Sequence, residues 1–467
     1  MSTALTGSYS RSSTPAVLDR RLGRFDAAAI IVSNVIGGGI LFTPPQVAAA
    51  VLSAPLFLST WIAGGLLAFA GAMAYAELAA LRPRAGGEYV YLRDAFGPLL
   101  AFLSGWTSFI AGFSGAIATA AVILAVYVGR FLPAAGVSTP FFTVPLLPGV
   151  VSLSFSPQTV VALAAIWGLA WVHLRGVGHG RVVGNVLATL KVAAFVLFIA
   201  FGFSFGEGSL ANIAEPGVAS PTGWLLALIP VMFTYSGWNA AAYVAEEIRD
   251  PGTNLPQALA MGTAAVIAIY LFMNALYLYV FPISQLAAIS GSVLDVIADR
   301  LLGTAAGNVM GVVSIVSLLA SISAMTFAGP RVYFAMARDG VFFPRAARVH
   351  ERYRTPAVAI VAQATWSSML VLSAGAAALV NYTGFAIVLF SGIAVLALFV
   401  LRRRNPDAER PFRAWGYPLA PAIYVTVSAI ILANGLYRTP GPTGAGVLVI
   451  LAGIPLYLLF RRRRHPD

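Results

Sequence analysis

Long apolar stretches recur along most of this chain, and short polar segments rich in arginine separate them. A helix that crosses the hydrocarbon core of a bilayer needs roughly 20 predominantly apolar residues. The pattern therefore predicts an all-α polytopic membrane protein with 12 transmembrane helices, at 25–50, 55–81, 97–132, 157–175, 182–204, 223–247, 255–281, 305–338, 356–375, 377–401, 418–437 and 443–460.

The amino-acid composition supports a membrane protein and argues against several kinds of functional site. Of the 467 residues, 59% are hydrophobic and 10% are charged, whereas soluble domains carry about 25% charged residues. The chain has no cysteine, which excludes a disulfide-linked partner and cysteine-bound metal. We find no HExxH motif, no intramembrane aspartate pair, no Ser/His dyad and no Walker lysine, so we expect no enzyme, metal site or cofactor. The histidines all fall in segments expected to be cytoplasmic: His173, His179, His350 and His465.

The arginines predict the orientation of the chain. The net charge is +12, and with the N-terminus inside only Arg130, Arg300 and Arg438, of 28 arginines, fall on the outer side. The positive-inside rule then predicts an even number of spans in the cell membrane and two cytoplasmic termini. Because arginine excess reports topology here, it gives no reason to expect a nucleic-acid partner.

Both ends of the chain are predicted to be cytoplasmic tails. Residues 1–24 lack the apolar core and cleavage site of a signal peptide, so we expect a disordered cytoplasmic tail. Residues 461–467 form a basic cytoplasmic tail that either binds anionic membrane lipid or fixes the topology.

Two predicted spans are interrupted. The first contains Gly37, Gly38 and Gly39, each of which weakens a helix by about 1 kcal/mol relative to alanine. The sixth contains Pro230 followed by the segment SGWN at 236–239. Glycines in membrane helices often serve only close packing. Matched interruptions five spans apart instead favour a transporter built from inverted repeats, with its site at the midplane.

The division that follows places the first repeat, helices 1–5, at 25–204 and the second, helices 6–10, at 223–401. An extracellular connection at 205–222 joins them. A cytoplasmic loop at 402–417 leads to the last two helices at 418–460.

A broken helix frees backbone groups that lipid cannot satisfy, and a polar ligand can. The amides near Gly38, Gly39 and Ile40 begin a half-helix and suit a carboxylate. The carbonyls near Val35 and Phe233 end half-helices and suit an ammonium group. Amides on one side and carbonyls on the other match an α-amino acid.

Four stretches resemble a known family. SNVIGGGILFTPPQVA is similar to the first-helix signature of the amino acid–polyamine–organocation superfamily, and FTYSGWNAAAYVAEEIRDPGTNLPQAL to its sixth-helix signature. YAELAALRPRAGGEYVYLRDAFGP resembles the stretch that joins its second and third helices, and RVYFAMARDGVFFP the loop after the eighth. The likeness covers about residues 25–420 and is nearest to the L-type amino acid transporter group and its bacterial relatives.

The resemblance implies the leucine-transporter-like fold, with two inverted five-helix repeats, two extra helices, and helices 1 and 6 unwound at the midplane. It implies that Phe233 is an aromatic gate and that Asn239 can face the substrate. Gly38 stands where the family has serine, and Leu41 where it has phenylalanine. The substrate-binding residues it implies are Val35, Ile36, Gly37, Gly38, Gly39, Ile40, Phe233, Ser236, Gly237 and Asn239.

Lys191 is the only lysine, and it lies inside an apolar run. Ten residues from Arg181 correspond to roughly 15 Å of helix, about half the depth of the membrane core. A lysine there costs about 2.5–3.5 kcal/mol, so its amine needs acceptors. Lys191 is either a structural residue that holds polar groups together or, as the resemblance implies, a replacement for a coupling sodium ion. In the second case its amine would lie between the first break and helix eight. Ser321 or Ser323 would then accept from it.

We therefore predict a sodium-independent secondary transporter, or permease, for L-amino acids, working by alternating access. Lys191 either replaces sodium permanently, which gives exchange or facilitated flux, or cycles a proton, which gives symport. Neutral substrates are favoured because neither break supplies an acidic residue; polyamines or cationic amino acids are the alternative. An amino-acid-binding membrane sensor without flux is the alternative from another class.

Three further residues have expected partners. Glu77 is expected to pair with Arg82 or Arg84 at the membrane interface. Glu246 and Glu247 are expected either to pair with arginines of the segment 331–354 or to be solvated. Trp238 is expected to pack around the second break.

Overall fold

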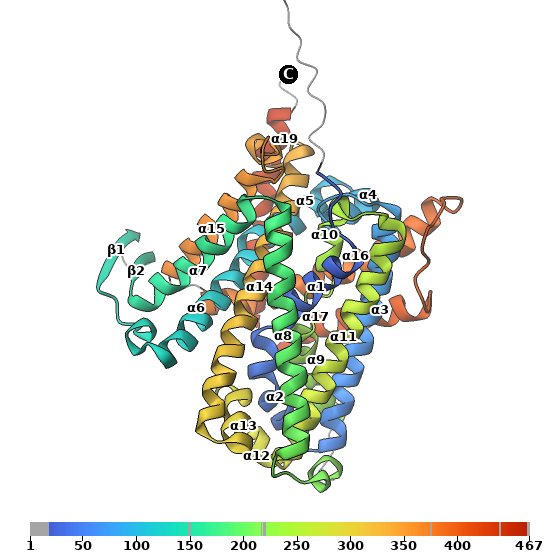
Figure 1. Ribbon diagram of the computed structural model, residues 1–467. Coiled ribbons are helices and arrows are strands. Elements are labelled where there is room, and N and C mark those ends of the chain that lie inside the picture. Colours follow the sequence, from blue (N-terminus) through green and yellow to red (C-terminus); the bar gives the residue numbers. More distant parts are fainter. Residues whose placement is uncertain are drawn as a thin grey trace, which may run out of the picture.

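The computed structural model describes residues 18–147, 151–215, 217, 221–373, 376–438 and 440–464. The remaining residues, which include 1–17 of the predicted N-terminal tail and 465–467 with His465, lie outside the described part. Most of the described chain is helical, and both of its ends lie at the top of Figure 1. We call this side, where Leu18 and the end of the last helix lie, the terminal face.

The elements of the first half follow the predicted spans closely. They are α1 (Arg24–Val35), α2 (Gly38–Val51), α3 (Ala54–Leu81), α4 (Glu88–Phe96), α5 (Pro98–Thr107), the π-helix η1 (Ser108–Gly112), α6 (Phe113–Phe131), η2 (Pro133–Gly136), β1 (Phe142–Leu147), β2 (Val151–Phe155), α7 (Pro157–Leu174), α8 (Val177–Phe205) and η3 (Leu210–Ala214).

The second half contains the remaining helices. They are α9 (Pro221–Thr234), α10 (Ala240–Tyr243), η4 (Ala245–Glu247), α11 (Pro251–Val280), α12 (Ile283–Ala287), α13 (Val293–Leu302), α14 (Thr304–Arg338), η5 (Pro344–Ala347), α15 (Ala357–Leu372), α16 (Ala376–Arg404), α17 (Leu419–Arg438), α18 (Pro440–Leu451) and α19 (Gly453–Arg464).

Each of the twelve predicted spans contains helical structure. Within the described residues, nine helices are long and apolar enough to cross a membrane alone, and α1 with α2 makes a tenth as a pair bent by 49°. Two shorter apolar helices, Thr222–Thr234 and Ala357–Leu372, fall at the predicted sixth and ninth spans. The all-α polytopic fold is thus confirmed, while the count of twelve crossings and the repeat boundaries stay predictions.

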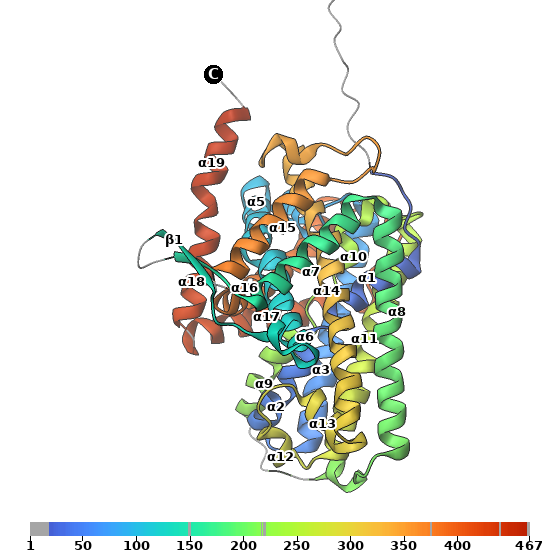
Figure 2. The same cartoon turned by 60° about the vertical axis from the view of Figure 1, so that its left-hand side comes forward.

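The hairpin of β1 and β2 was not predicted. Its strands pair antiparallel, with Phe142 opposite Phe155, and the register shifts between Pro145 and Leu147. The hairpin projects from the side of the helical bundle in both views (Figures 1 and 2). Short apolar runs of this kind do not distinguish strand from helix by periodicity.

Small residues let the helices that carry the two interruptions approach their neighbours. α1 packs against α8, α11 and α14, and α2 packs against α9. A Cβ atom on Gly71 of α3 would lie 2.6 Å from the Trp238 ring. Trp238 packs edge-on against Tyr75 and Tyr424, at centroid distances of 4.9 and 5.9 Å. The packing role expected for Trp238 is confirmed, and close approach through glycine is typical of membrane helices.

The partner expected for Glu77 is wrong. Its carboxylate accepts hydrogen bonds from Arg402, at 2.9 and 2.5 Å, and lies 3.2 Å from Arg410. Arg82 instead donates to Asp94 at 3.1 Å. The end of α16 returns beside α3, and this tertiary contact outweighs sequence proximity.

The pair between Glu247 and Arg331 is buried. The guanidinium donates to both carboxylate oxygens, at 2.7 and 3.1 Å, and the two side chains are 0% and 1% exposed. Arg331 also donates to the carbonyl of Phe327 and stacks on that ring. This contact joins the segment after the second interruption to α14, as expected for an arginine of 331–354.

We predict that Glu247→Ala destabilises the protein by about 3–5 kcal/mol, because it leaves the Arg331 charge buried without its partner. Thermal unfolding of the detergent-solubilised protein measures the change, with Arg20→Gln at an exposed position as the control. Equal melting temperatures for Glu247→Ala and the control would contradict the importance of this pair.

Candidate functional site

Both predicted interruptions are present in the backbone. α1 ends at Val35, Ile36 is extended, and α2 begins at Gly38 after a bend of 49°. The second interruption separates α9, which ends at Thr234, from α10, which begins at Ala240. Two membrane segments thus lose their helical hydrogen bonding partway along.

Two glycines are required where the interruptions meet. Gly237 has φ +100°, a conformation that L side chains rarely adopt, and a Cβ there would meet the side chain of Asn34 at 2.5 Å. A Cβ on Gly39 would lie 2.9 Å from Thr234. The side chain of Asn34 donates to the carbonyl of Gly237 at 3.2 Å, which ties the two interruptions together.

The amine of Lys191 fills the first interruption. Lys191 is 0% exposed, and its Nζ donates to the carbonyl of Ser33 at 3.1 Å, to the Ser321 hydroxyl at 3.3 Å, and to the carbonyl of Ile36. An ammonium group has three donors, and all three have an acceptor here. Of the two serines considered, Ser321 contacts the amine, and Ser323 contacts His173 instead.

Other hydroxyl groups complete the set of donors at the first interruption. The Tyr270 hydroxyl lies 2.9 Å from the carbonyl of Val35 and 3.2 Å from that of Thr234, so it reaches both interruptions. Ser317 donates to Ile36 at 3.4 Å. The carbonyls assigned by sequence to a substrate ammonium therefore already accept bonds from the protein.

A cavity of about 140 Å³ lies beside the second interruption. Ser236, Gly237 and Asn239 line it, together with residues of α5, η1, α6, α14 and α16. The predicted residues Val35 to Ile40 and Phe233 are not part of its lining. Phe233 lies close to α16, where a Cβ on Gly384 would be 3.5 Å from its ring.

Several polar residues of this cavity were not predicted from sequence, among them Asn34 and Glu88. Glu88 accepts hydrogen bonds from Tyr75 at 2.9 Å and Ser104 at 3.2 Å. Burial raises the pKa of the Glu88 carboxyl, against the opposite effect of these hydrogen bonds. The signal for Glu88 was the preceding pair of glycines, both at positive φ, which turn the chain so that α4 begins at the cavity.

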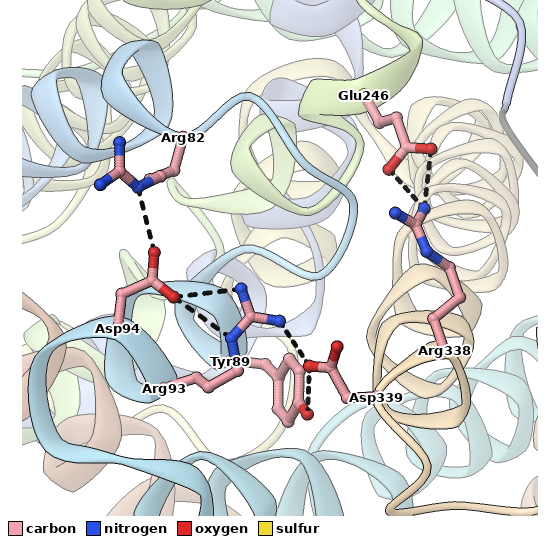
Figure 3. Close-up of polar contacts among 7 residues, drawn as sticks. All are labelled: Arg82, Tyr89, Arg93, Asp94, Glu246, Arg338 and Asp339. Carbon is pink, nitrogen blue, oxygen red and sulfur yellow. Dashed lines mark hydrogen bonds and ion pairs between the residues drawn. The ribbon is translucent and has the colours of Figure 1, made fainter. Parts of the chain in front are cut away.

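A network of ion pairs joins separate elements at the terminal face (Figure 3). Glu246 accepts from Arg338 at 2.9 Å and from the backbone amides of Ala85 at 3.1 Å and Leu18 at 3.4 Å. The pairing expected for Glu246 with an arginine of 331–354 is confirmed. One carboxylate thereby holds the N-terminal segment, the loop before α4 and the end of α14.

The same network contains a second centre at Arg93. Its guanidinium lies 2.5 Å from Asp339 and 3.0 Å from Asp94, and Tyr89 donates to Asp339 at 2.8 Å (Figure 3). Burial lowers the pKa of Arg93, but its hydrogen bond and charge interaction with Asp339 outweigh this and raise it. α4 and the end of α14 are therefore fixed to each other.

One histidine is not where it was expected. His173 lies inside α7, is 3% exposed, and its Nε2 is 2.9 Å from the hydroxyl of Ser323. Its helix is one of the apolar candidate spans. The expectation that every histidine falls in a cytoplasmic segment is wrong for this residue.

Known proteins are similar to this sequence over most of its length. The large neutral amino acids transporter small subunit 2 of Mus musculus is 30% identical over 455 residues, covering 95% of this chain and 81% of the relative. The Asc-type amino acid transporter 1 of Mus musculus is 29% identical, with the same two coverages. The serine/threonine exchanger SteT of Bacillus subtilis is 26% identical, covering 96% of this chain and 98% of the relative.

A family model described as amino acid permease matches residues 22–460. That range contains both interrupted helices, Lys191 and the cavity beside the second interruption. The chain belongs to the amino acid permease family and is a multi-pass membrane transporter.

Proposed function

We propose that the protein is a sodium-independent secondary transporter of neutral L-amino acids in the cell membrane, working by alternating access. The observation that carries the proposal is the Lys191 amine, which donates to Ser33, Ile36 and Ser321 at the first interruption. Because a cation belonging to the chain occupies these acceptors, a bound sodium ion is not needed to satisfy them. Relatives named as transporters of large neutral amino acids and of serine and threonine support the substrate class.

The proposed substrate site combines the two interruptions. The first turn of α2, at Gly38, Gly39 and Ile40, has amides without intrahelical acceptors and lies at the positive end of a helix dipole. These amides are proposed to bind the substrate carboxylate. The segment 233–237 is proposed to bind the ammonium group, because Ser236 and Gly237 of this segment line the cavity. Asn239 faces the side chain, and Phe233 acts as the gate.

Glu88 favours neutral over cationic substrates. It lines the cavity, but burial raises its pKa and so favours the uncharged acid. A polyamine or a cationic side chain would need a carboxylate there. Tyr75 and Ser104 also hold the carboxyl group, which reduces its freedom to turn toward a substrate.

The network at the terminal face supports alternating access. Glu246–Arg338 and Arg93–Asp339 are exposed enough to exchange with water, whereas Glu247–Arg331 is fully buried. Surface ion pairs contribute about 0–1 kcal/mol each, so the outer contacts can break and re-form during a transport cycle. The network is proposed to be the cytoplasmic gate.

The arginine distribution supports the proposed orientation, in which the terminal face is cytoplasmic and the repeats span 25–204 and 223–401. Because the chain has no cysteine, a single introduced cysteine reports its own side of the membrane. We expect a membrane-impermeant maleimide to label exposed Ser290→Cys, between α12 and α13, in intact cells. Exposed Glu351→Cys, before α15, should be labelled only after permeabilisation. The reverse pattern would invert the orientation.

We expect the purified wild-type protein in liposomes to accumulate a labelled neutral amino acid at the same rate with and without sodium. Lys191→Ala should reduce that rate by at least about tenfold, equivalent to about 1.4 kcal/mol, because the carbonyls at the first interruption lose their donor. Arg20→Ala, at an exposed position, is the control. Wild-type rates in Lys191→Ala would remove its proposed role, and substrate binding without flux in the wild type would indicate a sensor.

We expect Glu88→Gln, which resembles the uncharged acid, to keep uptake of neutral amino acids within a factor of about two. Raising the pH through the raised pKa of Glu88 should slow uptake by the wild type, since its carboxyl then ionises, and should leave Glu88→Gln unaffected. Competition with lysine and putrescine completes the test. Strong inhibition by either in the wild type, lost in Glu88→Gln, would instead favour a cationic substrate.

A further inference from the structure

A second, smaller pocket of about 20 Å³ lies between α1, α7, α8 and α14. Its polar lining consists of Asp26 and Ser33 from α1, His173 from α7, Arg181 and Asn185 from α8, and Ser323 from α14. It shares no lining residue with the cavity beside the second interruption. This pocket is therefore separate from the proposed substrate site.

Two buried polar atoms at this pocket have no hydrogen-bond partner among the described residues. They are Nδ1 of His173 and Oγ of Ser33, on side chains from residues that are 3% and 2% exposed. A Cβ on Gly180 would collide with His173 Nδ1, so the glycine leaves this nitrogen open. Buried polar atoms are normally hydrogen-bonded. A cavity of about 10–15 Å³ can hold one water that has two to four polar partners, and this pocket meets both conditions.

The pocket connects two different environments. At its outer end, Arg181 is 39% exposed and lies 3.9 Å from Asp26, whose other oxygen accepts from Asn185 at 2.6 Å. At its inner end lies Ser33, whose carbonyl accepts from the Lys191 amine at 3.1 Å. Polar groups therefore line the pocket from solvent at the start of α8 to Ser33, whose backbone carbonyl contacts the buried amine.

Two of the arginines near His173 face a carboxylate. From α14, Arg331 is neutralised by Glu247; from α1 and α8, Asp26 and Arg181 face each other. On its own helix end, Arg175 stacks on Trp171. Within the described residues no carboxylate forms an ion pair with His173, so the imidazole is not held as a permanent ion-pair partner.

We propose that His173, with one water bound between it and Ser33, is the proton route between Lys191 and the water at the terminal face. This proposal rests on the proposed function, in which the Lys191 amine occupies the first interruption, and it adds that this amine cycles a proton. The ammonium of Lys191 exchanges its bond to the Ser33 carbonyl for one to the bound water and releases a proton to that water. The water passes one proton to His173 Nδ1 while Nε2–H donates to Ser323. The imidazolium returns that proton to water at the Asp26 rim. One proton leaves the amine, one reaches solvent, and no other bond changes.

The test compares exchange with net uptake in liposomes. We expect His173→Gln, which keeps a donor toward Ser323 but cannot carry a proton, to exchange amino acid normally at equal pH on both sides. Uptake driven by a pH gradient, and the accompanying proton signal from a trapped pH dye, should fall by at least about tenfold, because positioned proton-transfer groups contribute about 10²–10⁴-fold. His179→Gln, exposed on α8, is the matched control and should change neither measurement.

Gly180→Ala provides a second variant that leaves the imidazole intact. Its added methyl group would fill the space beside Nδ1, so it should reproduce the selective loss of proton-driven uptake. Equal losses of exchange and net uptake in both variants would overturn the proposal and assign His173 a structural role. Wild-type proton signals in His173→Gln would also overturn it. Sodium-independent exchange by the wild type without any proton movement would overturn the route alone, whereas absence of flux would reject the proposed function itself.

Discussion

The structure depends on one constraint: a helix that unwinds inside a bilayer must have its freed backbone groups satisfied by the protein itself. At the first interruption this is achieved by an amine and three hydroxyl groups that come from other helices. The three N–H donors of Lys191 meet three acceptors there. Ser317, Ser321 and Tyr270 supply the remaining donors. A lysine buried at this depth is expensive on its own. It is stable here because its amine donates to backbone carbonyls that have lost their helical hydrogen bonds.

The same constraint explains how the two interruptions are joined. The Tyr270 hydroxyl lies within hydrogen-bonding distance of one carbonyl from each, and Asn34 donates from the first to Gly237 in the second. Gly39 allows the backbone of α2 to approach Thr234 closely. A rearrangement at either interruption must therefore break or remake bonds to the other. This coupling gives a physical basis for linking the state of Lys191 to the cavity beside Gly237.

The parts of this arrangement that sequence could predict are those with a local signal. The glycine triplet and the SGWN segment indicated both interruptions, and the isolated lysine in an apolar run indicated a buried amine that needs acceptors. Glu88 was missed although the glycine pair before it is a local signal. Asn34 and His173 were missed in their present roles, because each acts through contacts with residues far away in the chain. The wrong partner for Glu77 has the same origin: Arg402 is distant in sequence and adjacent in space. Local pattern predicts which groups need a partner, and only the fold decides which partner they receive.

The number of donors also limits what the first interruption can do. Because Lys191 uses all three of its hydrogens as an ammonium, deprotonation removes one of them and turns the nitrogen into an acceptor. The two remaining hydrogens can still serve the carbonyls of Ser33 and Ile36, but the Ser321 hydroxyl can then donate to the nitrogen instead of to those carbonyls. The bonds that hold the end of α1 are consequently weaker in the neutral state. A proton on a single buried amine can thus change how firmly one half-helix is held, without any motion imposed from the surface.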